Sequence, residues 1–159
     1  MCSDNICSVA IRKDLPDEPK LFALIHELKH HWADRDAMRA GLLSCGSYNE
    51  NELIEKAAEV FAAEFLYPEA EFAQDIGAFK DAFSVTQLGA DDLIHFKRNG
   101  CKAKVSYTFL RKRLEWLGLA IPGQFSGVRF QKREEELYGV PIYKQKSFVA
   151  RRKLRLSRS

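Results

Sequence analysis

The feature that most constrains this chain is a stripe of apolar side chains with helical spacing between residues 19 and 32. Its members are Leu21, Ile25, Leu28 and Trp32. Intervals of four, three and four place such residues on one face of an α-helix. Asp17 can cap this helix, and Pro19 suits its first position. We therefore expect a helix that ends near residue 32 and packs through the apolar stripe.

The same helix carries two histidines one turn apart, His26 and His30, with Glu27 directly after the first. Residues four positions apart share a helical face, so both imidazoles can converge on one metal ion. A carboxylate beside the first of them can take a proton from water, as in HExxH zinc peptidases. Because the apolar stripe is complete without the histidines, packing does not explain them. We predict that His26 and His30 bind zinc and that Glu27 is the general base.

The other two histidines are interpreted without a metal. His31 adjoins the motif but points about 100° away from His30 around the helix, which favours a place on the surface. His95 is isolated in the sequence, and we expect a partly buried side chain with no ligand role.

A second helix is expected over residues 51–66, because Pro68 disfavours helical backbone just before it. Glu55 and Glu59 share one face of this helix. A zinc peptidase site needs a third protein ligand and an open position, and either glutamate can supply the ligand. The alternative is that its glutamates form only the solvated side of an amphipathic helix, which accounts well for Glu52 and Glu64.

The remaining elements predict an α+β fold in one metallopeptidase domain over residues 1–130. A strand is expected at 5–12, and further helices at 69–83, 89–98 and 107–117. Ser106 can cap the last helix and Gly118 can close it. We expect a small zincin-like sheet packed against the helical bundle that carries HExxH, with a helix-turn-helix-like part at about 84–120. Residues 131–159 are expected to form a basic, poorly ordered tail.

Composition narrows the class of protein. The chain has 159 residues, of which 46% are hydrophobic and 30% charged, an ordinary globular profile. No apolar run approaches the roughly 18 residues that a membrane span needs, and no secretory signal pattern is visible. The four cysteines form no CxxC pair. We therefore expect a cytoplasmic protein with free thiols and no membrane association.

Charge is unevenly distributed, which keeps a second class of function open. Acidic residues concentrate at 50–75, whereas residues 97–113 and 143–159 carry bases and no acid. A basic helix with Arg111 and Arg113 can contact phosphates or a partner. The alternative to a peptidase is therefore a repressor- or DNA-binding module without catalysis, although a lone helix-turn-helix-like segment supports nucleic-acid binding only weakly.

At this point the sequence resembles the ImmA/IrrE family of metallopeptidases over about residues 5–120. The motifs are HELKHHW at 26–32 and EKAAEVFAAEFLYP at 55–68, where family members show HELGH and a helix close to E-x-x-A-N-x-F-A-A-x-L-L-x-P. A weaker match is the VS…RL…LG pattern between Val105 and Gly118. Lys29 stands where the family has Gly, and we expect this change to be harmless on an exposed face.

The resemblance implies roles for individual residues. His26 and His30 become zinc ligands, Glu27 the catalytic base and Glu55 the third ligand. Glu59 stands where the family has Asn or Asp, and it is implied to orient one of the histidines. Known members cleave phage-type or stress-response repressors, so the resemblance implies a regulatory zinc endopeptidase whose partner is a transcriptional repressor.

Overall fold

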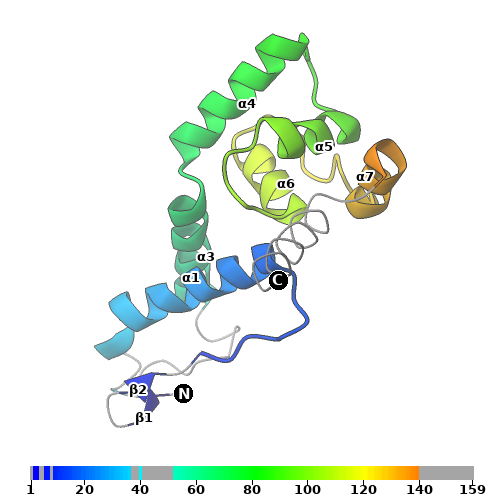
Figure 1. Ribbon diagram of the computed structural model, residues 1–159. Helices are drawn as coiled ribbons and strands as arrows, with labels where there is room; N and C mark the ends of the chain where they lie inside the picture. The colour runs from blue at the N-terminus through cyan, green and yellow to red at the C-terminus, as the bar shows by residue number, and fades with distance from the viewer. Residues whose placement is uncertain (1, 4–5, 8, 37–39, 41–51, 140–159) are drawn as a thin grey trace, which may run out of the picture. The chain divides into compact units, whose positions relative to one another are not determined.

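The computed structural model describes residues 2–3, 6–7, 9–36, 40 and 52–139, which form six helices and one short strand pair (Figure 1). The helices are α1 (Asp17–Ala33), α3 (Glu52–Leu66), α4 (Glu69–Phe83), α5 (Ala90–Asn99), α6 (Tyr107–Trp116) and α7 (Phe130–Tyr138). The strands are β1 (Cys2–Ser3) and β2 (Ile6–Cys7). The chain divides into two compact units, the first made of Met1–Glu69 with Ala103–Val105 and the second of Ala70–Lys102 with Ser106–Ser159.

The predicted α+β fold is wrong. The described part of the chain is helical, and its strands are limited to the antiparallel pair β1–β2, in which Cys2 lies opposite Cys7 and Ser3 opposite Ile6. The alternation between residues 5 and 12 had suggested a sheet strand, but Val9 is 46% exposed and lies outside both strands. A pair this short offers no face on which helices can pack, because stable sheets need more and longer strands.

Local signals placed most helices well. The helices predicted over 51–66 and 69–83 are found as α3 and α4, with Pro68 between them. α6 begins where the Ser106 side chain accepts a hydrogen bond from the Phe109 backbone N–H at 3.2 Å. Gly118 follows its end with φ of +68°, a conformation that glycine adopts without strain. No described helix has the length and apolar character that crossing a bilayer requires.

α1 begins earlier than predicted and buries a different face. The helix starts at Asp17, after Pro16 in the N-cap position, and no side chain caps it. Of the predicted apolar stripe only Ile25 is buried, while Leu21 is 38% and Trp32 is 65% exposed. The other buried residue of α1 is His30. The side of α1 that carries the histidines therefore faces the neighbouring helix.

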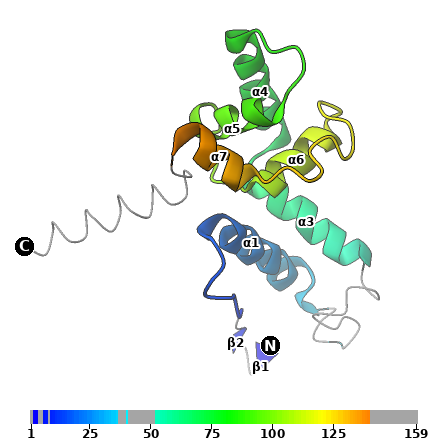
Figure 2. The same cartoon turned by 90° about the vertical axis from the view of Figure 1, so that its right-hand side faces the viewer.

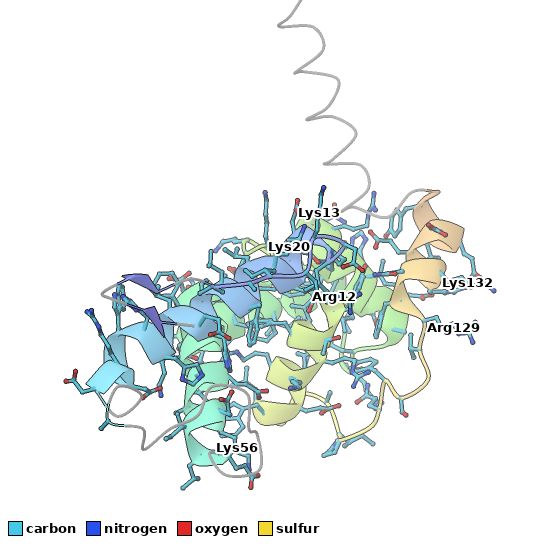
Figure 3. All side chains as sticks on the ribbon, turned by 90° about the horizontal axis from the view of Figure 1, so that it is seen from below. Arg12, Lys13, Lys20, Lys56, Arg129 and Lys132 are labelled. Atoms are coloured by element: carbon cyan, nitrogen blue, oxygen red, sulfur yellow. The ribbon has the colours of Figure 1, made fainter. Side chains whose placement is uncertain are left out.

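That neighbour is α3, which packs beside α1 in the first unit (Figures 1 and 2). A hydrogen bond joins the segment before α1 to the helix: the Lys20 Nζ donates to the Lys13 carbonyl oxygen at 2.8 Å. Figure 3 shows Arg12, Lys13 and Lys20 together where the chain enters α1, with Lys56 on α3 apart from them. Arg12 pairs with Asp14 at 2.6 Å, so this exposed cluster is partly neutralised.

The second unit has an aromatic core between α4 and α5. Phe96 of α5 is fully buried and meets two phenylalanines of α4, Phe72 at 5.9 Å and Phe79 at 5.5 Å between ring centroids. Both contacts are edge-to-face, the geometry that aromatic rings prefer. The backbone of Gly100, just after α5, lies close to the Phe96 ring, since a Cβ at Gly100 would be 2.8 Å from it. Only glycine lets the chain leave α5 this near the core.

α7 is an element that the sequence analysis missed, since it expected a tail from residue 131; residues 140–159 lie outside the described residues. The helix is held by Glu134, whose carboxylate is fully buried. It accepts a hydrogen bond from Arg98 of α5 and another from the Tyr107 hydroxyl of α6, each at 2.8 Å. The Tyr107 ring also stacks on Phe130 at 4.8 Å. One glutamate in the charged sequence of α7 is therefore buried, and its carboxylate joins three helices.

We expect Glu134→Ala to destabilise the protein by about 3–5 kcal/mol, because it removes the buried carboxylate that accepts hydrogen bonds from Arg98 and Tyr107. Urea unfolding followed by circular dichroism measures the change. Glu136→Ala is the matched control on the same helix, since Glu136 is exposed and pairs with Arg133 at the surface. An equal loss in both variants would show that the buried contact is not what holds α7.

Candidate metal centre

One group of His, Cys, Asp and Glu side chains among the described residues lies close enough together to hold a metal ion: His26, His30 and Glu55. The His26 Nε2 lies 3.0 Å from the Glu55 Oε2 and 3.2 Å from the His30 Nε2. The His30 Nε2 is 3.6 Å from the other Glu55 oxygen. The three side chains are only 9–19% exposed. α1 thus supplies two donor atoms and α3 a third.

The donor set fits a zinc ion. With metal–ligand bonds of about 2.0–2.1 Å, neighbouring ligands of a tetrahedral zinc lie about 3.3 Å apart. Two of the separations lie close to that value: 3.0 Å between the His26 Nε2 and the Glu55 Oε2, and 3.2 Å between the two Nε2 atoms. The His30 Nε2 lies nearer the other carboxylate oxygen, at 3.6 Å. Two Nε2 atoms that face each other can share at most one proton, whereas a cation satisfies both lone pairs. Two imidazoles and one carboxylate are also the ligands of many catalytic zinc sites.

The sequence of α3 explains how Glu55 comes near the histidines. Glu55, Ala58 and Ala62 follow one another at intervals of three and four, so they share one face of the helix. Both alanines are fully buried. Side chains this small let helix backbones approach closely, and a glutamate on the same face can then reach across to its neighbour. Lys56, the next residue, is exposed and pairs with Glu52 instead.

Asp34 is a contact of the site that the sequence analysis did not find. Its Oδ2 accepts a hydrogen bond from the His30 Nδ1–H at 2.7 Å. The Lys29 Nζ donates to both Asp34 oxygens, at 2.9 and 2.7 Å. Burial raises the pKa of Asp34, but the hydrogen bonds from Lys29 and His30 outweigh it and hold that pKa below its ordinary value. The signal in the sequence was an acid four residues after the second histidine.

Lys29 was expected to lie on an exposed face of the helix. Its side chain is only 13% exposed, so that expectation is wrong. Glu27 is half-buried, and no hydrogen bond or ion pair joins it to another described residue. Glu59 is half-buried as well, and it is not part of the ligand group found among the described residues. The role predicted for Glu59 stays a prediction.

The residues proposed for contacts with nucleic acid lie in the second unit. Arg113 is buried, with its guanidinium 5.6 Å from the centroid of the Phe109 ring. Arg111 is half-buried on the same helix. His95 is half-buried, as expected, and its Nδ1 lies 2.8 Å from the Tyr138 hydroxyl. His31 is also half-buried, so it is less exposed than its position in the sequence suggested.

Comparison with known proteins places this geometry in context. The model of a peptidase family, M78, described as an IrrE N-terminal-like domain, matches residues 4–115, which is more than half of the chain. That stretch contains α1 and α3 and therefore the whole ligand group. No curated protein and no solved structure matches the chain.

The geometry allows the two glutamates of α3 to be distinguished by experiment. We expect Glu55→Ala to weaken zinc binding more than Glu59→Ala, because Glu55 contributes an atom to the ligand group. Loss of a residue that only orients a ligand typically costs 10- to 100-fold in affinity. Titration against a competing chelator measures both variants. The reverse order would mean that Glu59 is the ligand, and that the Glu55 contact with His26 does not persist around a metal.

Proposed function

The chain belongs to peptidase family M78, and we propose that it is a zinc-dependent endopeptidase of the HExxH type. The observation that carries the proposal is the convergence of the His26 Nε2, the His30 Nε2 and the Glu55 carboxylate within 4.8 Å of one another. Glu27 follows the first histidine on the same helix. A binding module without catalysis would not need to bring two imidazoles and a carboxylate together around one point.

The roles of the residues follow from their chemistry. His26, His30 and Glu55 would hold the ion. When bound, zinc supplies Lewis acidity, which polarises a carbonyl oxygen and makes water more acidic. Glu27 would accept the proton of an attacking water and return it to the leaving amine.

We further propose that the substrate is a transcriptional repressor. The support is the resemblance of the HELKHHW and EKAAEVFAAEFLYP motifs to the ImmA/IrrE family, whose known members cleave such regulators. A repressor acts on DNA, so a cytoplasmic enzyme would share its compartment. Contacts of the protein itself with nucleic acid are not part of the proposal, because Arg113 is buried against Phe109.

The metal part of the proposal makes a direct prediction. The purified protein should hold about one zinc per chain by elemental analysis, and a chelator should remove it. The double substitution of His26 and His30 by alanine should abolish binding, because it removes both imidazole ligands. Full retention of zinc in that variant would refute the assignment.

The catalytic part is tested with Glu27→Gln, which removes the base and leaves the ligands. We expect this variant to keep its zinc and to lose peptidase activity, since proton transfer contributes about 10²- to 10⁴-fold. Wild-type and variant protein are added to an extract of the source cells, and new N-termini are identified by mass spectrometry. Wild type alone should create new termini in a repressor. The same cleavages with Glu27→Gln would exclude Glu27 as the base.

A further inference from the structure

We propose that Asp34, held in place by Lys29, is a positioning residue that fixes the ring and tautomer of His30 so that its Nε2 faces the metal centre. The role in zinc binding rests on the proposed function, whereas the contacts of Asp34 with Lys29 and His30 do not. The inference concerns two residues other than the histidines and the glutamate that define the HExxH motif. One of them, Lys29, stands where the resembled family has glycine.

The contact between Asp34 and His30 settles which nitrogen carries the proton. The two atoms, His30 Nδ1 and Asp34 Oδ2, are 2.7 Å apart, and a carboxylate can only accept at that position. The proton of a neutral His30 therefore lies on Nδ1. The lone pair is left on Nε2, the atom that faces His26 at 3.2 Å and Glu55 at 3.6 Å. This is the tautomer that a ligand bound through Nε2 must have.

Lys29 fixes the carboxylate in turn. Its Nζ donates to both oxygens of Asp34, so rotation of the carboxylate would break two charge-assisted hydrogen bonds. Lys29 and Asp34 are 13% and 12% exposed, which limits exchange of these bonds with water. The order Lys29–Asp34–His30 is thus a chain of partners, each holding the next.

Helix stability alone does not account for an acid at this position. Asp34 is the C-cap residue of α1, and its backbone N–H donates to the His30 carbonyl oxygen at 3.1 Å. A negative charge at the C-terminal end of a helix opposes the helix dipole. A carboxylate there is useful because it reaches back one turn to the imidazole, and Lys29 offsets its charge.

The first test uses the metal-free protein, so it does not depend on zinc. In ¹⁵N-labelled protein at mildly alkaline pH, the ring nitrogen shifts of His30 report its tautomer. We expect the proton on Nδ1 in wild type and loss of that preference in Asp34→Ala. A wild-type His30 with its proton on Nε2 would overturn the proposal, whether or not the protein is a peptidase.

The second test measures affinity for zinc against a competing chelator. We expect Asp34→Ala to bind zinc about 10- to 100-fold more weakly than wild type. Asp34→Asn, which keeps the shape and an acceptor oxygen, should lie between them. Lys29→Met should weaken binding by less, and adding it to Asp34→Ala should cause no further loss because the two act through one contact. Cobalt(II) absorption should change in the same order if the His30 ring moves.

Asp14→Ala is the matched control, since Asp14 also pairs with a basic side chain in the first unit but is exposed. It should leave zinc affinity and the His30 tautomer unchanged. Melting curves of the metal-free variants detect a general loss of folding. Zinc affinity of Asp34→Ala equal to wild type would overturn the positioning role while leaving the proposed function intact. Absence of zinc binding in wild type would instead refute the proposed function. The tautomer measurement would still decide whether Asp34 positions His30.

Discussion

The close approach of α1 and α3 is the constraint on which the candidate site depends. α1 contributes His26 and His30, and their partner Glu55 comes from the other helix, 29 residues after His26 in the chain. The approach is possible because Ala58 and Ala62 are fully buried on the Glu55 face of α3. Larger side chains there would separate the helices, and the carboxylate would no longer reach the imidazoles. Helix packing and site geometry are thus set by the same few residues.

Much of this arrangement could be predicted from local sequence. Pro68 marks the end of α3, Ser106 the start of α6 and Gly118 its end, because each acts through its own backbone geometry or hydrogen bonding. The spacing of HExxH placed both histidines on one face for the same reason. Periodicity could not show which face of α1 would be buried, and there the expectation failed. Trp32 belongs to the more apolar face yet is 65% exposed, while His30 is buried.

The features that sequence could not reveal are those that depend on partners distant in the chain or on charge inside the protein. The expected sheet rested on one alternating segment, but pairing needs a second strand of similar length, and the described residues provide only β1 and β2. α7 was missed because its charged residues suggested a solvated segment, whereas Glu134 is buried against Arg98 and Tyr107. Lys29 was misjudged for the same reason. Its charge suggested a side chain exposed to water, but the ammonium group pairs with Asp34 instead.

The placement of Glu134 has a consequence for how the protein can be divided. The part of the chain that matches the family model ends at residue 115. Arg98 and Tyr107 lie inside that part, but the carboxylate that satisfies both lies 19 residues beyond its end. A fragment cut at that boundary would lack the buried carboxylate that accepts hydrogen bonds from both side chains. The matched residues therefore omit a side chain that joins α5, α6 and α7, and only a fragment that extends through α7 retains it.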